Sequence, residues 1–362
     1  MDLINYGWND FFEECFAPLR AEEYSAGRIA IQNKNNYMLY TEFGELSGEV
    51  SGKLFYEVEE DITGESSLPA VGDWVAFRPY PEEKKAIIDK VLPRQSKFSR
   101  KEAGIRTKEQ VVAANIDNIF IMASLNQDFN IRRLERYLIL GAESGSRPVI
   151  VLSKADLCED AERMSAEVKA IAGKVPVCIV SSLTGKGIEE LLGFFGGNKT
   201  VAVIGSSGVG KSTLINTLYG EERMKVKDIT EYKDKGQHTT THRELVRLPG
   251  GGLIIDTPGM REIQLWGGDE GASEVFDDIE ELMQTCKFSD CSHTSEPGCS
   301  VLEALEDGTL DEDRYKSYKK LQREIRYLES RNNKKMMHNT KKKWKQITKA
   351  VREKNKYRKG GL

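Results

Sequence analysis

The chain has 362 residues, which is more than one ordinary domain needs and predicts two or three domains. Its composition, 39% hydrophobic and 30% charged with a mean hydropathy of -0.49, is typical of a soluble globular protein and excludes a helical membrane protein. The net charge of -4 conceals an asymmetry: residues 316–362 hold 18 Lys and Arg against 3 Asp and Glu, a local charge of +15 that leaves -19 elsewhere. This basic tail on an acidic body indicates a polyanionic partner.

The N-terminus and the cysteines indicate where the protein works. The first residues, MDLINYGWNDFFEECF, lack the basic and apolar regions of a secretory signal. Three of the six cysteines fall between residues 286 and 299, which favours a metal site in a reducing compartment over a disulfide framework. We therefore expect a cytoplasmic protein that does not bind membranes.

Residues 1–20 predict a short amphipathic lead, and a series of short β-rich runs follows. The runs are separated by turn residues, a spacing that predicts a small β-barrel. An oligonucleotide-binding (OB) fold and a purely structural β-domain both stay open at this point. The predicted runs are GRIAIQ (27–32), NYMLYT (36–41), GEVSGKLFYEV (48–58), VGDWVAF (71–77) and AIIDKVL (86–92).

After a polar connector over residues 97–110, strands alternate with helices, which predicts a mostly parallel sheet covered on both faces. The expected strands are 117–124, 148–153, 175–180, 200–204 and 252–256. The expected helices are 131–143, 159–172, 187–195 and, beyond the cysteines, 311–330.

Residues 205–212, GSSGVGKS, match the phosphate-loop pattern G-x-x-x-x-G-K-[ST] between a strand and a helix. The glycines let backbone N–H groups point at phosphates, and the strand–helix context disfavours a turn without a ligand. Lys211 is expected to reach the β- and γ-phosphates, and the Ser212 hydroxyl to ligate Mg2+. The predicted nucleotide contacts here are Gly205, Ser206, Ser207, Gly208, Val209, Gly210, Lys211, Ser212 and Thr213.

Two motifs downstream are suited to the γ-phosphate and Mg2+. The strand at 252–256 ends in D-x-x-G, where Asp256 is expected to hold Mg2+ and the Gly259 amide to sense the γ-phosphate. Between the phosphate loop and this strand lies GQHTTTH (236–242), whose Thr240 or Thr241 could close over Mg2+. A flexible loop with coincidental threonines is the alternative.

Residues 150–157, IVLSKADL, form a strand that ends in a candidate guanine-recognition loop. The Asp156 carboxylate can accept from both N1–H and the exocyclic amine of guanine, while the Lys154 stem covers the ring. Alternatively, Ser153 or Asp156 caps the next helix. A second loop, VSSLTG (180–185), ends the following strand, where another base-contacting loop belongs. The predicted base contacts are Ser153, Lys154, Ala155, Asp156, Ser181, Ser182 and Leu183.

The order base loop, second base loop, phosphate loop, threonine loop and D-x-x-G resembles that of the circularly permuted GTPases. Within them, GSSGVGKST, GQHTTTHREL, DTPGMRE and the following cysteine cluster are similar to the RsgA family of small ribosomal subunit biogenesis GTPases. The resemblance covers nearly the whole chain. One departure is Ser153, where the family usually has Asn. A serine makes fewer of the hydrogen bonds that brace the base loop, which predicts weaker nucleotide binding. Asp156 should still select guanine.

The cysteine cluster, Cys286-x4-Cys291-x-His293-x5-Cys299, offers three thiolates and one imidazole within fourteen residues. This ligand set predicts one closed, tetrahedral structural zinc site, with free cysteines and a surface histidine as the alternative. CKFSDCSHTSEPGC also resembles the zinc knuckle of the same family, with a structural or RNA-docking role. The other cysteines, expected in the core, are Cys15, Cys158 and Cys178.

The basic tail interleaves lysines with Trp344 and Tyr357, which favours RNA contact over a solvated charged helix. The resemblance narrows that partner to the small ribosomal subunit and its rRNA. After Gly259, where Ras-like enzymes place a water-orienting glutamine, the chain has Met260, so intrinsic hydrolysis should be slow. His238 is our candidate to complete the catalytic set, with packing or solvent exposure as the alternative.

The sequence thus predicts a monomeric multidomain α/β GTPase that binds GTP or GDP with Mg2+. It also predicts that the protein acts as a switch, in which GTP hydrolysis releases the protein from the maturing small subunit. The alternatives are an RNA-binding scaffold that uses GTP structurally, and a P-loop ATPase. The expected domains are a lead and OB-like barrel (1–100), a circularly permuted GTPase domain (101–270), a zinc-binding helical domain (271–330) and a basic tail (331–362).

Overall fold

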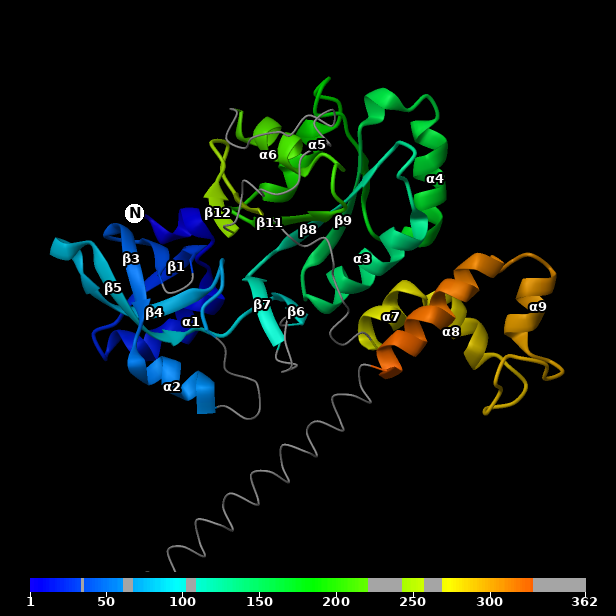
Figure 1. The fold of residues 1–362 in the computed structure, drawn as a ribbon, viewed down its shortest axis with the longest axis horizontal. Coiled ribbons are helices and arrows are strands. Elements are labelled where there is room, and N and C mark those ends of the chain that lie inside the picture. The colour runs from blue at the N-terminus through cyan, green and yellow to red at the C-terminus, as the bar shows by residue number, and fades with distance from the viewer. Residues whose placement is uncertain (34–35, 61–67, 102–108, 221–242, 257–268, 328–362) are drawn as a thin grey trace, which may run out of the picture.

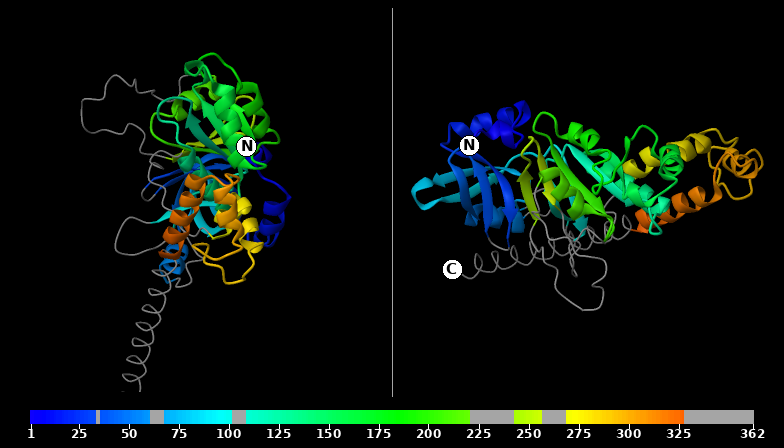
Figure 2. Two further views of the ribbon diagram at one scale, coloured as in Figure 1. Left: turned by 90° about the vertical axis from the view of Figure 1, so that its right-hand side faces the viewer. Right: turned by 90° about the horizontal axis from the view of Figure 1, so that it is seen from above.

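The computed structural model describes residues 1–33, 36–60, 68–101, 109–220, 243–256 and 269–327. These residues form three parts in a row: a β-barrel, a central sheet with helices on both faces, and a group of C-terminal helices (Figures 1 and 2). Within the described ranges, every helix is too short or too polar to span a lipid bilayer.

The N-terminal lead is a short 3-10 helix, η1 (Leu3–Tyr6), followed by α1 (Asp10–Arg20). Asn9 caps α1, because its side-chain oxygen accepts from the Phe12 N–H at 3.3 Å. The helix buries Phe12 and Phe16 against a cluster that includes Trp74 of the barrel. The lead therefore closes one side of the barrel with its apolar face, as its amphipathic pattern predicts.

The predicted barrel is confirmed as a closed, five-stranded one. Strand β1 pairs with both β2 and β4, and the order β1-β2-β3-β5-β4 returns to β1 with β3 and β5 parallel. The strands are β1 (Ser25–Gln32), β2 (Tyr37–Thr41), β3 (Gly44–Val50), β4 (Trp74–Tyr80) and β5 (Lys85–Val91), with the 3-10 turn η2 (Pro81–Glu83) between the last two.

Two expectations about this part of the chain were wrong. The run over 48–58 is a strand only to Val50; it then becomes α2 (Gly52–Glu60), in which Leu54 and Val58 recur at helical spacing and pack on the barrel core. The connector over 97–110 is not irregular. It contains β6 (Lys97–Lys101), paired antiparallel with β7 (Glu109–Ala114), so its polar composition hid a β-ribbon.

The central sheet has the order β10-β9-β8-β11-β13-β12, with every neighbouring pair parallel except β12 and β13. Its edge strand β12 was not predicted. The strands are β8 (Asn118–Ser124), β9 (Arg147–Ser153), β10 (Val177–Ile179), β11 (Thr200–Gly205), β12 (Arg243–Arg247) and β13 (Leu253–Asp256). The helices between them are α3 (Ile131–Glu143), η3 (Ala155–Leu157), α4 (Ala161–Ala172), α5 (Ile188–Leu192), η4 (Gly193–Phe195) and α6 (Lys211–Tyr219).

Each face of this sheet has its own apolar core. Ile119 and Ile121 of β8 belong to a cluster with residues of α3 and α4, whereas Phe120 and Met122 belong to a second cluster with residues of α5 and α6. Because alternate residues of a strand point to opposite faces, the continuous apolar run of β8 supplies both cores. This is the doubly covered sheet that the alternating pattern predicts.

The barrel is joined to the sheet by backbone hydrogen bonding. Strand β1 pairs antiparallel with β12 at Ile31↔Glu244 and Gln32↔Arg243, so barrel and sheet form one continuous eleven-stranded sheet. The Tyr40 hydroxyl donates to the Leu245 carbonyl at 3.2 Å across the same junction. The barrel therefore continues the central sheet beyond β12.

The C-terminal helices dock on α3. They are α7 (Asp269–Val275), α8 (Asp277–Gln284), α9 (Ser300–Glu306) and a helix over residues 312–327. Glu135 of α3 is fully buried and accepts from Arg314 at 3.0 Å and from Ser317 at 2.9 Å, while Arg314 also pairs with Asp278 of α8 at 2.7 Å. This ion cluster attaches the C-terminal helices to the sheet.

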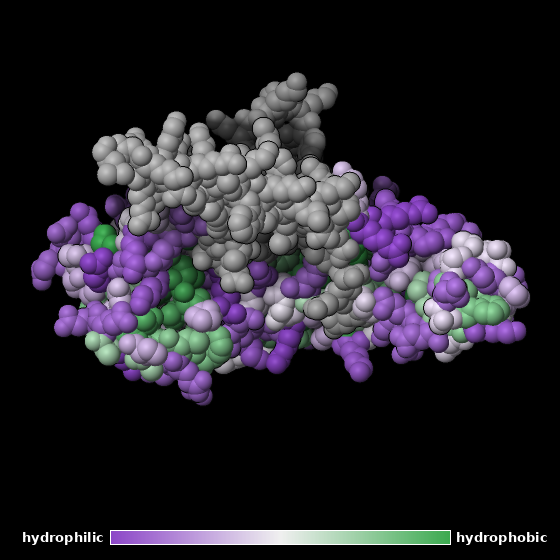
Figure 3. Space-filling model, turned by 90° about the horizontal axis from the view of Figure 1, so that it is seen from below, coloured by the Kyte–Doolittle hydropathy of each residue, from purple (hydrophilic) through white to green (hydrophobic). Residues whose placement is uncertain are grey.

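Hydrophobic side chains reach the surface at both ends of the molecule. Figure 3 shows them gathered over the barrel end and, in a smaller patch, at the tip of the C-terminal end. Exposed apolar side chains of the barrel include Phe43, Phe55, Tyr56 and Tyr80, each at least 46% exposed. The C-terminal end exposes Phe288 and Tyr327, so aromatic surface is present at both ends.

Candidate functional site

The phosphate loop follows the central strand β11 and leads into α6 (Figure 1). Gly205 has φ +151°, and a Cβ there would lie 2.7 Å from the Met122 carbonyl, so only glycine fits between the loop and β8. Val209 is 1% exposed and anchors the loop in the core beneath it, while Ser207 and Gly208 are exposed. The loop is therefore anchored in the core on one side, while its other side is exposed to solvent.

The lysine and hydroxyls predicted to meet phosphates stand at the start of α6. Lys211 Nζ donates to the carbonyls of Gly205 at 2.8 Å and Ser206 at 2.7 Å, which holds the ammonium close to the loop. Ser212 and Thr213 follow in the first turn and are half-buried. Gly210 takes the N-cap position with φ +104°. Lysine, hydroxyls and helix N-terminus therefore converge at one end of the sheet.

The candidate base loop lies beside the phosphate loop. Ser153 is the last residue of β9, is 5% exposed, and its hydroxyl donates to the Val209 carbonyl at 2.6 Å. Lys154 takes a left-handed conformation with φ +59°, which turns the chain into η3. Helix α4 starts only at Ala161 with Asp160 as its N-cap. Neither Ser153 nor Asp156 therefore caps this helix, and that alternative is wrong.

The second loop contacts the first directly. The Ser181 hydroxyl donates to Asp156 Oδ1 at 2.5 Å, and the Ala155 N–H donates to the Val180 carbonyl at 3.1 Å. Ser182 is half-buried, and Leu183 is 83% exposed beside this pair. The structure therefore joins base loop, second loop and phosphate loop through side-chain and backbone hydrogen bonds.

The remaining candidates for this site lie at or beyond the limit of the described residues. Asp256 is the last residue of β13, and its backbone pairs with Val203 of β11, next to the phosphate loop. The others fall outside the described residues: His238, Thr240, Thr241, Gly259 and Met260. Their predicted roles stay predictions.

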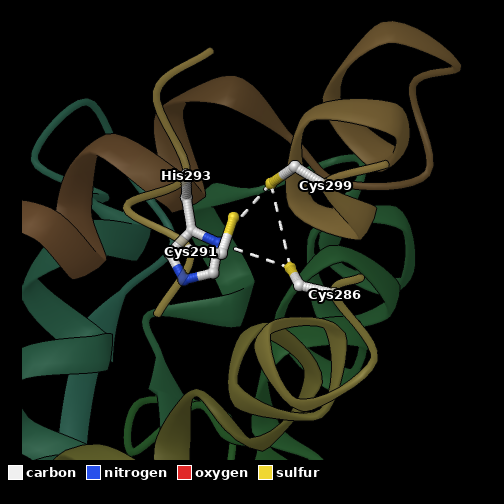
Figure 4. Close-up of side chains that lie close together, drawn as sticks. All are labelled: Cys286, Cys291, His293 and Cys299. Atoms are coloured by element: carbon white, nitrogen blue, oxygen red, sulfur yellow. Dashed lines mark hydrogen bonds between the residues drawn. The ribbon is translucent and has the colours of Figure 1, made fainter. Parts of the chain in front are cut away.

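The four predicted zinc ligands come together between α8 and α9 (Figure 4). The sulfurs of Cys286 and Cys299 are 3.8 Å apart, and each lies 3.5 Å from His293 Nδ1. A tetrahedral zinc ion with Zn–S about 2.3 Å and Zn–N about 2.0–2.1 Å requires sulfurs about 3.8 Å apart and S···N separations of about 3.5 Å. With Cys291 included, all four donor atoms lie within 4.8 Å of one another. The residues fit zinc.

Local backbone shapes the charge and geometry of this cluster. Although burial raises the pKa of the Cys286 thiol, the backbone N–H groups of Ser300 and Val301 at the start of α9 and the neighbouring thiols hold it below its usual range. His293 has φ +55°, a left-handed conformation in the loop between Cys291 and Cys299. The surroundings of Cys286 therefore favour the thiolate that a metal needs.

Sequence reasoning missed a residue that shapes this loop. The Glu296 carboxylate accepts from the N–H groups of Ser292 at 2.9 Å, Thr294 at 3.0 Å and Ser295 at 3.1 Å, and from the Ser292 hydroxyl. These bonds hold its pKa well below the usual range, with the Ser292 hydroxyl the largest cause. The available signal was an acidic residue among Ser and Thr inside the ligand spacing, which favours side-chain-to-backbone turns.

Comparison with known proteins finds relatives that match both the nucleotide loops and the cysteine cluster. The RsgA GTPase family model matches residues 91–266, and the 50S ribosome-binding GTPase model matches residues 200–343. The small ribosomal subunit biogenesis GTPase RsgA of Opitutus terrae is 44% identical over 361 residues, which is 97% of each chain.

Two solved structures share the fold. YjeQ from Thermotoga maritima matches with a TM-score of 0.61 and 28% identity, over 83% of this chain and 98% of that one. YloQ, described as a circularly permuted GTPase, matches with a TM-score of 0.56 and 25% identity, over 84% of this chain and 95% of that one. The early position of the base loop is therefore a circular permutation.

Proposed function

The chain belongs to the RsgA family of GTPases and is a GTP-hydrolysing enzyme, and from this premise we propose that it couples GTP hydrolysis to late assembly of the small ribosomal subunit. In this proposal the GTP-bound protein binds the subunit and its rRNA, and hydrolysis releases it. A ribosomal partner would place this work in the cytoplasm. The observation that carries the proposal is the 44% identity, over 97% of the chain, to a small ribosomal subunit biogenesis GTPase. The Ser153–Val209 hydrogen bond supports the nucleotide site itself, because it joins the early base loop to the phosphate loop.

In the proposed nucleotide site, each loop has a separate task. The exposed Asp156 carboxylate accepts from guanine, and the Ser181 hydroxyl orients it by donating at 2.5 Å. Lys154 covers one face of the base with its alkyl stem. The N–H groups of the phosphate loop and Lys211 bind the phosphates, and Ser212 supplies a hydroxyl to Mg2+. Bound Mg2+ would neutralise charge that develops on the phosphates.

For hydrolysis, we propose that the protein alone is slow. Met260 cannot position or polarise water, because a thioether is a weak acceptor and no donor. We assign the missing role to His238, with Thr240 or Thr241 and Asp256 at Mg2+ and the Gly259 amide at the γ-phosphate. Contact with the ribosomal subunit would complete this catalytic set and so accelerate turnover.

The proposed RNA-facing parts lie beyond the nucleotide loops. The cysteine cluster would hold one zinc ion that fixes the loop between α8 and α9, with four ligands and no open position for catalysis. Residues 316–362, with their local charge of +15, would contact rRNA phosphates together with this region. The buried Glu135–Arg314 pair would transmit the position of these helices to α3 of the sheet.

The test is GTP turnover by the purified full-length protein with and without purified small subunits. We expect slow turnover alone and stimulation of about 10³-fold or more, the order that groups completing a GTPase site supply. Large subunits serve as the control and should not stimulate. Equal turnover in all three conditions would contradict coupling to the small subunit, while leaving GTP hydrolysis itself intact.

A further inference from the structure

A polar cavity of about 260 Å³ opens where the lead, the barrel and the central sheet meet. Asn118, Arg147 and Thr200, at the N-terminal ends of β8, β9 and β11, contribute to its lining. The phosphate loop follows the opposite end of β11, and a six-residue strand spans roughly 20 Å. The cavity is therefore separate from the nucleotide site.

The charge lining this cavity is mostly positive. Arg28, Arg147 and Lys199 line it, against a single carboxylate, Asp117. One Asp117 oxygen already accepts from the Thr200 N–H at 2.8 Å. Neither Arg147 nor Lys199 has an ion-pair partner among the described residues. An excess of two positive charges therefore faces the cavity.

Arg28 is the unusual member of this set, because it is only 1% exposed. Its guanidinium donates to the carbonyls of Gly72 at 3.2 Å and Asn115 at 2.9 Å, and to that of Tyr6. No carboxylate within the described ranges lies at ion-pair distance from it. A buried charge that is held by carbonyl dipoles and the Trp74 ring, without a paired carboxylate, is costly, and an anion in the cavity would offset that cost.

The cations that reach this cavity supply donors for such an anion. Arg147 is exposed and Lys199 half-buried where they line it. Guanidinium and ammonium donors suit an oxyanion.

We propose that this cavity binds a small phosphate-bearing anion, either orthophosphate or a phosphomonoester, between Arg28, Arg147 and Lys199. The excess of two positive charges favours a dianion over a monocarboxylate, and the volume admits a phosphate with a small organic group but little more. Because Arg28 already contacts the lead and the segments before β4 and β8, the bound anion would strengthen the junction of barrel and sheet. Its presence would stabilise the folded protein by mass action.

The test uses the full-length protein saturated with GDP and Mg2+, so that the phosphate loop is already filled. Calorimetric titration with orthophosphate and with ribose 5-phosphate distinguishes the free ion from an ester. The double variant Arg147→Ala, Lys199→Ala should lose about a hundredfold or more in affinity, since it removes two charge-assisted hydrogen bonds. The control Lys169→Ala, Lys174→Ala removes the same charge from exposed positions near α4 and should bind like the wild type.

Failure of both anions to bind the wild type at millimolar concentration would overturn the proposal, as would equal affinities in the double variant and its control. If only a short single-stranded RNA binds, and the double variant loses that binding, the cavity is an RNA contact and the small-anion assignment is wrong. None of these readouts depends on GTP turnover, so failure here leaves the proposed function standing.

Discussion

In the nucleotide loops, residues 56 positions apart in the chain touch, whereas all four donors of the cysteine cluster lie within fourteen residues. The first region is assembled by a sheet: Ser153, Val180 and Gly205 end or follow parallel strands of the same sheet, β9, β10 and β11, so their loops lie at one edge of it whatever the chain order. The second is assembled by one loop between two short helices. A circular permutation can therefore reorder the segments of the nucleotide site without disrupting it. The cysteine cluster instead depends on the spacing of its four ligands within one segment.

The nucleotide loops and the cysteine cluster also differ in the packing that stabilises them. Beneath the nucleotide loops lie strands whose inward residues are almost fully buried. The cysteine loop has little core of its own, since only Cys299 among its four donors is fully buried. We therefore expect the loops to keep their shape without ligand and the cluster to depend on its metal.

The largest effect should follow loss of a thiolate. Cys286→Ser replaces a zinc ligand with a poor one, so we expect zinc affinity to fall by more than about a hundredfold, beyond the 10–100-fold typical of outer-shell changes. Guanine nucleotide binding should change little, because the sheet assembles that site independently. Bound zinc measured by mass spectrometry or a chelating dye, alongside fluorescent GDP binding, checks both. Cys158→Ser, a cysteine outside the cluster, is the control. Loss of nucleotide binding in parallel with zinc would break the contrast between the regions.

Asp156→Asn probes the sheet-assembled region, with an effect of about a hundredfold. The carboxylate would accept two hydrogen bonds from guanine, and losing charge-assisted bonds of this kind costs about 3 kcal/mol in total. GTP affinity should fall and xanthosine triphosphate affinity should rise. Zinc content should not change.

The matched control for that change is Asp160→Asn, which alters an exposed carboxylate four residues later that pairs with Arg163 at 3.5 Å. It should bind GTP like the wild type. An Asp156→Asn variant that still prefers GTP would show that the guanine is recognised elsewhere.

Glu296→Gln should have the next largest effect, about tenfold on zinc affinity. The amide keeps one acceptor oxygen but loses the charge that gathers three N–H groups and a hydroxyl, so the turn around His293 is less well held. Competition with a zinc-binding dye measures the change. Glu306→Gln, at the exposed end of α9, is the control. An unchanged zinc affinity would mean that the metal alone orders this loop.

The sequence made the long strands and helices predictable, and helix 131–143 coincides with α3 because its apolar spacing is unambiguous. The change from strand to α2 was missed, since Leu54 and Val58 lie among aromatic residues that also suit strands. β12 was missed because a five-residue strand with charges at both ends, RELVR, carries little pattern. The β6–β7 ribbon was hidden by polar residues for the same reason.

At the candidate sites, ligand types and spacing could be predicted, but orientation could not. Motif order placed Asp156 near the phosphate loop, yet nothing local reveals that the Ser181 hydroxyl holds its carboxylate. That contact depends on the register between β9 and β10, which is a long-range property of the sheet. Glu296 was missed because most of its partners are backbone N–H groups, and its place among Ser and Thr residues was the only local signal of them.

The smallest expected effect belongs to Ser153, and it tests whether the permuted loops behave as one unit. Ser153→Ala removes the bond to the Val209 carbonyl, and a neutral hydrogen bond is worth about 1 kcal/mol, so GTP affinity should fall about fivefold. Ser165→Ala is the matched control, because it deletes a buried hydroxyl that has no partner among the described residues. Titration with a fluorescent GTP analogue resolves such a difference. If both variants bind GTP equally well, the 2.6 Å contact does not brace the nucleotide site, and the strands alone hold the two loops together.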